Sequence, residues 1–151
     1  MRYSRGFTLV ELLVTLAVLA IVLGFAVPSF QNMVESNRVT STTNNLVGLL
    51  NYARAEAMRY GRTVAVVPVD GDYAKGVAVQ VGGKDLRVIE GSRGTVTIAM
   101  AQGAALGFRG NGLSNQSNEI NYRICGTAGR SGSLVRVGIG GQIRSESLTC
   151  P

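Results

Sequence analysis

The sequence of 151 residues contains no histidine and no tryptophan, and it has only two cysteines. Histidine and cysteine supply most ligands of zinc sites and iron–sulfur clusters, and histidine is the usual base of nucleophilic triads. The sequence offers no other acid–base or nucleophilic constellation in their place. We therefore expect a protein that is not an enzyme and that binds no metal or cofactor.

Lysine is scarce as well, because only Lys75 and Lys84 occur among 15 basic residues. The acidic residues number 9, which leaves a formal net charge of +6 carried mainly by arginine. A basic chain of this kind can attract an anionic partner.

A long run without charge, residues 12–30, follows a short basic N-terminus. At about 1.5 Å of rise per residue, a helix over this run would span roughly 28 Å, enough to cross the hydrocarbon core of a bilayer. Arg2 and Arg5 precede the run, so the positive-inside rule places the N-terminus in the cytoplasm and the rest of the chain outside. Glu11 lies at the start of the apolar stretch, where an unpaired charge is costly, and it therefore needs a partner.

Residues 5–14, Arg-Gly-Phe-Thr-Leu-Val-Glu-Leu-Leu-Val, resemble the leader junction of type IV pilins and type II secretion pseudopilins. The resemblance implies that a prepilin peptidase cuts between Gly6 and Phe7 and methylates the new amine of Phe7. It also implies that Glu11 serves assembly, with its carboxylate neutralised by the terminal ammonium of a neighbouring subunit, and that Pro28 is the family's helix-kinking proline. The alternative is a simple signal anchor in which Glu11 snorkels to the membrane interface.

Apolar residues continue at three- and four-residue spacing after residue 30, which predicts one amphipathic helix that ends at Arg59 or Tyr60. Gly61 is a suitable stop. The segment 40–45, Thr-Ser-Thr-Thr-Asn-Asn, is poor helix sequence and could form a weak or frayed turn, but we expect the helix to continue through it.

Beyond Gly61 the pattern changes to alternation and short apolar runs separated by glycine-rich turns, which is typical of antiparallel strands. The predicted strands are residues 63–69, 77–81, 86–90, 96–100, 120–125, 134–139 and 142–147. The expected fold class is α+β, with a long N-terminal helix followed by an antiparallel β-rich head. The predicted divisions are a leader (1–6), a transmembrane and assembly segment (7–30), an amphipathic helical half (31–61) and the β-rich head (62–151).

Three further segments narrow the resemblance to the GspH/FimT/FimU group of minor pilins and pseudopilins. They are residues 51–57 (NYARAEA), the predicted turn 106–112 (LGFRGNG) and residues 140–144 (GGQIR) in the last hairpin. The resemblance implies a subunit of the bacterial inner membrane with its head in the periplasm, present in few copies, which helps to initiate a pilus or pseudopilus or forms its tip. Its implied partners are the prepilin peptidase, other minor pilins and the major pilin, or pseudopilins.

Cys125 and Cys150 would be exposed to an oxidising compartment, and one disulfide between them is the simplest expectation. A free reactive thiol and a bridge between subunits are the alternatives. The glycine-rich segments do not match nucleotide-binding loops. Asp70 and Asp72 could in principle bind calcium, but two carboxylates without further ligands favour a solvated turn.

Strand alternation predicts which side chains of the last three strands are buried. It places Ile120, Tyr122, Ile124, Val135, Val137 and Ile139 inward. Arg123 and Arg136 then point outward, Arg144 follows an inward Ile143, and Arg130 lies in the loop between strands.

These four arginines are candidate ligands for the phosphates of double-stranded DNA. Some FimT-type members bind DNA during natural transformation through a C-terminal G-R-x-R arrangement, and residues 141–144 resemble it with Gln142 in place of the first arginine. The alternative is that these arginines point outward only because a solvent-exposed sheet face carries charged residues that keep the protein soluble. The sequence thus supports three functions: a minor pilin in filament assembly, a DNA-binding minor pilin, and a pseudopilin of type II secretion.

Overall fold

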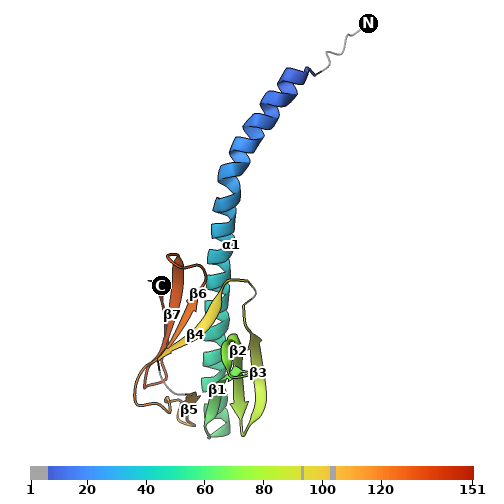
Figure 1. The fold of residues 1–151 in the computed structure, drawn as a ribbon. Helices are drawn as coiled ribbons and strands as arrows, with labels where there is room; N and C mark the ends of the chain where they lie inside the picture. The colour runs from blue at the N-terminus through green and yellow to red at the C-terminus, as the bar shows by residue number, and fades with distance from the viewer. Residues whose placement is uncertain (1–6, 93, 103–104) are drawn as a thin grey trace. The chain divides into compact units, whose positions relative to one another are not determined.

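The structure is a computed structural model that describes residues 7–92, 94–102 and 105–151. It consists of one helix, α1 (Leu9–Tyr60), followed by eight strands (Figure 1). The chain divides into two compact units, an N-terminal unit that ends at Val34 and a C-terminal unit, Glu35–Pro151. The predicted leader, including Gly6, lies outside the described residues.

The N-terminal unit is helical from Leu9 onward, and its apolar side chains are exposed. Pro28 lies inside the helix. Since a membrane or other subunits would cover such a surface, exposure here is the expected state of an isolated chain.

In the C-terminal unit the helix continues without interruption through residues 40–45 and ends at Tyr60. The helix predicted through residues 40–45 is confirmed, and the weak or frayed turn considered within it does not form. Thr42 and Thr43 are buried, and the Thr43 hydroxyl donates to the Val39 carbonyl at 2.8 Å. Tertiary packing overrides the low helix propensity of these residues. Gly61 has a φ of 63°, a left-handed conformation that ends the helix as predicted.

The strands form two antiparallel sheets of four strands each. The first has the order β3-β2-β1-β5 and contains β1 (Val64–Val69), β2 (Asp72–Val81), β3 (Lys84–Glu90) and β5 (Leu106–Phe108). The second has the order β4-β6-β7-β8 and contains β4 (Thr97–Gln102), β6 (Ile120–Cys125), β7 (Ser131–Val137) and β8 (Ile143–Thr149).

Two of our strand expectations need correction. Leu106–Phe108 was expected to be part of a turn, but it pairs with β1 because all three residues are buried and Phe108 lies opposite Val64. Ile139 was expected to be buried, but β7 ends at Val137 and the Ile139 side chain is 55% exposed in the following turn. Ile120, Tyr122, Ile124, Val135 and Val137 are buried as predicted.

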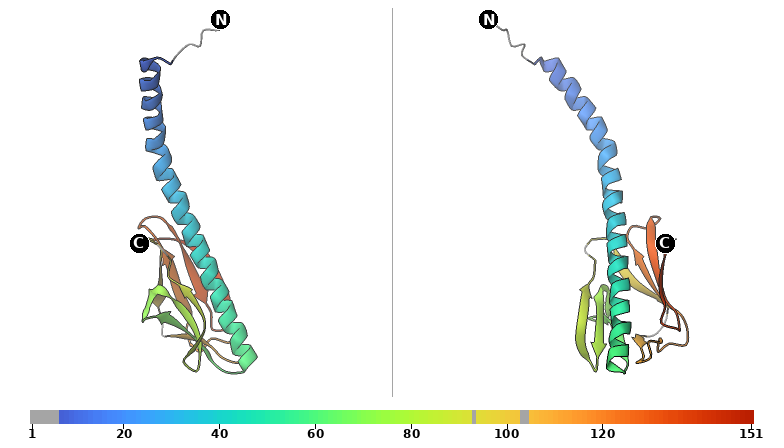
Figure 2. Two further views of the ribbon diagram at one scale, coloured as in Figure 1. Left: turned by 90° about the vertical axis from the view of Figure 1, so that its right-hand side faces the viewer. Right: turned by 180° about the vertical axis from the view of Figure 1, so that it is seen from behind.

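One hydrophobic core joins the helix to both sheets of the C-terminal unit. Leu46, Leu50 and Ala53 on α1 pack with residues such as Val66 of the first sheet and Ile124 of the second, all fully or almost fully buried. The view from behind shows the helix lying across the sheets (Figure 2). The C-terminal unit therefore contains a complete core of its own.

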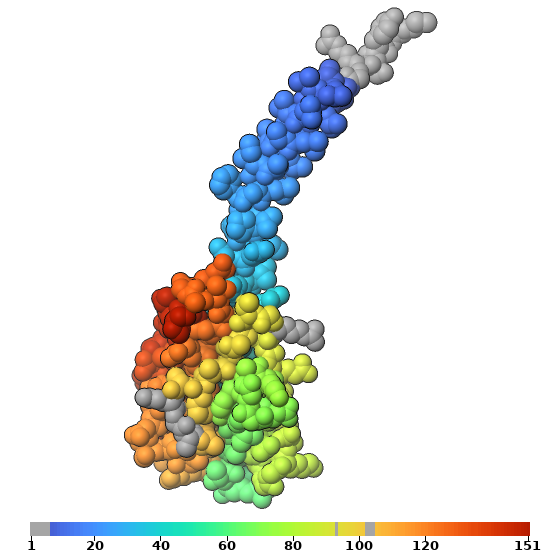
Figure 3. Space-filling model, viewed as in Figure 1, coloured from blue at the N-terminus to red at the C-terminus, as the bar shows by residue number. Residues whose placement is uncertain are grey.

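The two sheets meet at strands β2 and β4. In the space-filling view β4 (yellow) lies between the first sheet and the orange and red strands β6 to β8 (Figure 3). The β2–β3 hairpin closes through Gly82 and Gly83, both with positive φ, and a Cβ at either position would meet open space.

Candidate functional site

The first candidate site is the start of the helix, where Thr8 and Glu11 form a capping box. The backbone N–H and the hydroxyl of Thr8 each donate to Glu11 Oε2 at 3.0 Å, and the Glu11 N–H donates to the Thr8 hydroxyl at 3.2 Å. The partner that Glu11 requires is thus supplied, in the isolated chain, by its own helix cap. The Thr-x-x-Glu spacing is visible in the sequence, and sequence analysis missed it.

The helix behind this cap is apolar enough to span a membrane, with a mean hydropathy of 2.7 over its most apolar window and none of that window buried. Phe7, next to the predicted cleavage point, is 75% exposed. Glu11 is the only ionisable side chain in residues 7–34. The surface is therefore suited to lipid and to packing against other apolar helices.

A second candidate site links the helix to the β-rich head through Glu35. Its carboxylate accepts hydrogen bonds from the Thr127 N–H at 2.6 Å, from the Thr127 hydroxyl at 2.9 Å and from Arg130 at 3.1 Å. The hydrogen bond from the Thr127 backbone is the main cause of a lowered Glu35 pKa, and the Arg130 charge acts in the same direction. Only 14% of the Glu35 side chain is exposed.

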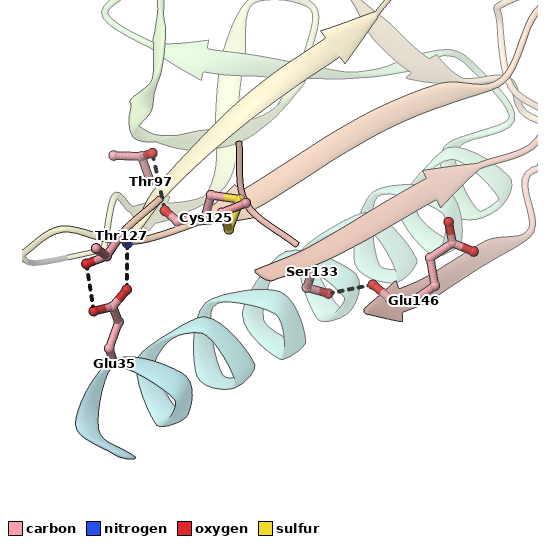
Figure 4. Close-up of a disulfide and its surroundings, with 7 residues drawn as sticks. Glu35, Thr97, Cys125, Thr127, Ser133 and Glu146 are labelled. Carbon is pink, nitrogen blue, oxygen red and sulfur yellow. Dashed lines mark hydrogen bonds between the residues drawn. A yellow bond between two sulfur atoms is a disulfide. The ribbon is translucent and has the colours of Figure 1, made fainter. Parts of the chain in front are cut away.

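Thr127 and Arg130 belong to the loop between β6 and β7. This loop begins beside the disulfide between Cys125 and Cys150, which forms as predicted, with 5.7 Å between the Cα atoms (Figure 4). The loop is also tied to the C-terminus through its backbone, since the Gly129 N–H donates to the Cys150 carbonyl and the Cys150 N–H to the Arg130 carbonyl. Gly132 lies so close to both sulfur atoms that a Cβ at this position would collide with them. Glu35, the loop and the C-terminus thus form one connected group.

A third candidate site is formed around Arg54 on the helix. Its guanidinium donates to the carbonyl of Gly112 at 3.0 Å and to that of Gly140 at 3.4 Å. These three residues come from the three segments that carried the narrower family resemblance. The structure shows that the segments lie together, which sequence spacing could not reveal.

The four arginines proposed to bind DNA differ in their surroundings. Arg136 forms ion pairs with Glu119 and Glu146, and hydrogen bonds to these carboxylates, first to Glu146, raise its pKa. Arg130 is paired with Glu35.

Arg123 and Arg144 have no side-chain ion pair or hydrogen bond within residues 7–92, 94–102 and 105–151. Arg144 lies opposite Arg136 in the β7–β8 register. Because Arg136 and Arg130 are paired with glutamate carboxylates, the second sheet is less basic than its number of arginines implied.

Asp70 lies in the turn between β1 and β2, and Asp72 is the first residue of β2. Asp70 and Gly71 both have positive φ, and the Asp72 carboxylate accepts the Ala74 N–H at 2.8 Å. Asp70 is also 3.6 Å from the Lys75 ammonium. These contacts account for both carboxylates as parts of a hairpin turn.

Comparison with known proteins agrees with this architecture. The family model described as "Type II transport protein GspH" matches residues 42–141. The chain belongs to the GspH family. A model of the prokaryotic N-terminal methylation motif matches residues 1–27, which include Gly6, Phe7 and Glu11.

This GspH-family chain is 29% identical over 116 residues to the fimbrial protein EcpC of Eikenella corrodens, with 74% of this chain and 72% of EcpC covered. A fimbrial protein of Pseudomonas aeruginosa is 26% identical over 114 residues, with 71% of this chain and 73% of the relative covered. The crystal structure of the P. aeruginosa type IV minor pilin FimU in space group P21 superimposes with a TM-score of 0.65 at 26% identity. It covers 79% of this chain and 99% of the FimU chain.

These relatives confirm the predicted pilin-like fold and the family resemblance. The chain is a minor pilin of the type IV pilus/GspH family. Membership implies assembly with other pilins, processing by a prepilin peptidase at the methylation motif and anchoring through the apolar helix.

Proposed function

We propose that this chain is a minor pilin that assists the initiation of a type IV pilus-like filament or forms its tip. A prepilin peptidase cuts between Gly6 and Phe7 and methylates the Phe7 amine. The single helix then holds the subunit in the bacterial inner membrane with its head in the periplasm, until the subunit is drawn into the filament with other minor pilins and the major pilin.

The observation that carries this proposal is an exposed apolar helix joined to a unit that already has its own core. The core residues of the C-terminal unit are buried against one another. The apolar side chains of residues 9–30 are left for lipid in the membrane and for neighbouring helices in a filament.

Glu11 supports the same proposal, because it is the single charge on this surface. The Thr8 cap holds the carboxylate in the free subunit. The ammonium of a neighbouring processed subunit then neutralises it during assembly, since a paired charge is tolerated in an apolar core and an unpaired one is not. The role is structural, and we propose no enzymatic activity.

The description of the matching family model favours a second candidate, a minor pseudopilin of type II secretion. The same helix, cap and head serve that role equally well. Deleting the gene separates the two candidates, because loss of surface pili with normal secretion supports the first, and loss of secreted enzymes with normal pili supports the second.

The processing step is tested with Gly6→Ala, examined by electrophoresis and mass spectrometry of the membrane fraction. We expect an uncut precursor that is absent from sheared filaments, beside a wild type that is six residues shorter and methylated at Phe7. A Gly6→Ala protein that is cut and assembled normally would contradict the proposal.

A further inference from the structure

The two sheets of the C-terminal unit end in four edge strands, and three of them carry features that block pairing with another chain. Strand β3 has four charged residues among seven and an irregular register with β2. Strand β5 has only three residues, and the pairing of β4 with β6 is shifted between Met100 and Gln102.

Strand β8 lacks these features. It has seven residues, contains neither proline nor lysine, and pairs with β7 in an unbroken register from Ile143 to Thr149. Its two charges, Arg144 and Glu146, share one face of the strand. An edge of this kind is a template for one more strand.

The hydrogen bonds at both ends of the β7–β8 pair show which backbone groups are unpaired. The Gly138 N–H donates to the Gln142 carbonyl at one end, and the Cys150 N–H donates to the Arg130 carbonyl at the other. Bonded and non-bonded positions alternate in an antiparallel pair, so Ser145 and Ser147 direct their N–H and C=O groups away from β7. Within the described part of the chain, no residue bonds to this side of β8.

A groove of about 350 Å³ lies beside this part of the strand, between β7–β8 and the helix. Ser36, Thr40 and Asn44 line the helix wall, and Ser133, Ser145 and Ser147 line the strand wall. Figure 4 shows Ser133 and Glu146 on the two strands beside the helix. Hydroxyl groups on both walls and the Asn44 amide on the helix wall can hydrogen-bond to a polypeptide backbone, and Val39 offers an apolar contact for a small side chain.

We infer that β8 accepts an extended segment of a neighbouring pilin-type subunit as an added strand. The inference rests on the proposed function, which places other pilins around this chain. The added strand bonds to the outward backbone groups of Ser145 and Ser147, and its inward side chains enter the hydroxyl-lined groove. Glu146 is already paired with Arg136, whereas Arg144 is exposed and has no ion pair among the described residues. The entering strand therefore carries a carboxylate opposite Arg144.

The first test compares Ser147→Pro with Ser147→Ala in the full chain, produced in cells that assemble filaments. Proline removes the outward N–H of residue 147 without breaking a bond to β7, which an edge strand tolerates. Alanine keeps that N–H and removes only the hydroxyl. We expect at least a fivefold loss of the proline variant from sheared filaments, and wild-type incorporation of the alanine variant. Equal incorporation of both variants and the wild type would overturn the inference and leave the proposed function intact.

A second measurement remains informative if Ser147→Pro fails to fold. A photo-crosslinking phenylalanine derivative replaces Ser147, or Ser117 in the exposed loop before β6 as a control, and the crosslinked peptides are identified by mass spectrometry. We expect position 147, but not position 117, to be joined to an acidic extended segment of another pilin. Crosslinks only to a second copy of this chain, or none in filaments that contain it, would overturn the inference. Absence of wild-type protein from filaments would overturn the proposed function itself.

Discussion

The Glu35 carboxylate accepts a hydrogen bond from the Thr127 N–H at 2.6 Å, across 92 positions of the sequence. The contact fixes the loop next to the disulfide onto the helix, where Arg130 adds an ion pair. The attachment of the β-rich head to the helix thus depends on a charge as well as on the hydrophobic core.

Glu35→Gln should therefore lower the stability of the protein, because a neutral amide loses the ion pair with Arg130 and has one acceptor oxygen in place of the two that accept from Thr127. We expect Tm to fall by several degrees in thermal unfolding at pH 7. Glu90→Gln, at an exposed position of β3, is the control and should leave Tm unchanged. Equal Tm values for the two variants would show that the contact contributes nothing.

The stability should also depend on pH in a defined direction. The folded protein lowers the Glu35 pKa, so the carboxylate stabilises the fold above its unfolded pKa of about 4.3, and this contribution is lost as the pH falls through the folded value. Unfolding by urea between pH 6 and pH 3 should show a smaller acid-induced loss of stability in Glu35→Gln than in the wild type. Parallel curves would contradict this assignment.

The disulfide should be a major source of stability. In the chain-entropy model, closing a loop with a sequence separation of 25 residues contributes about 3.5 kcal/mol to the free energy of unfolding. The double variant Cys125→Ala/Cys150→Ala should lose roughly this amount in urea denaturation. Mass spectrometry of the non-reduced wild type should find the two cysteines joined, and recovery of two free thiols from oxidised protein would disprove the bridge.

Two substitutions separate the cap from the assembly role of Glu11. Glu11→Gln keeps a side chain that can complete the capping box but removes the charge, whereas Thr8→Val keeps the charge and removes the hydroxyl. If the charge pairs with a neighbouring ammonium, filament content should fall strongly in Glu11→Gln and little in Thr8→Val, with both proteins inserted and cut normally. The reverse order would assign Glu11 to helix capping alone.

The DNA-binding alternative predicts a difference between two pairs of arginines. Arg123→Ala/Arg144→Ala removes guanidinium groups that no described carboxylate neutralises, and Arg130→Ala/Arg136→Ala removes groups that are already paired. Both variants lower the net charge equally. In titrations with duplex DNA at two salt concentrations, the affinity of the first variant should be at least about tenfold lower than that of the second. The affinity of the wild type should fall steeply with salt. No binding by the wild type at low salt would exclude this function.

Much of this protein could be predicted from local sequence patterns. The helix end at Tyr60, the inward faces of β6 and β7, and the pairing of the cysteines followed from periodicity, turn residues and the oxidising compartment. The helix through residues 40–45 was also predicted correctly, although only the structure shows that burial of Thr42 and Thr43 against the head holds this poor helix sequence in place. Leu106–Phe108 was missed because three residues show no period, and the strand exists only through its pairing with β1.

The contacts of the charged residues could not be predicted in the same way. Glu35 with Thr127, and Arg54 with Gly112 and Gly140, are brought together by the tertiary fold from distant segments. Alternation correctly placed Arg136 on the outer face of its strand, but it gave no indication of Glu119 as a partner. Counting arginines therefore overstated the positive charge available to an anionic ligand.

The turn at Gly82 and Gly83 has a practical consequence for labelling this protein. Family membership implies processing of the N-terminal segment, and the disulfide fastens Cys150 to β6, so an insertion near either segment would disturb a functional or structural contact. The β2–β3 turn is exposed, an added side chain at Gly82 or Gly83 would meet open space, and the turn lies on the sheet that does not contain β8. Surface turns of this kind tolerate insertions well. An epitope or fluorophore site placed there would report on the subunit in a filament and leave both ends intact.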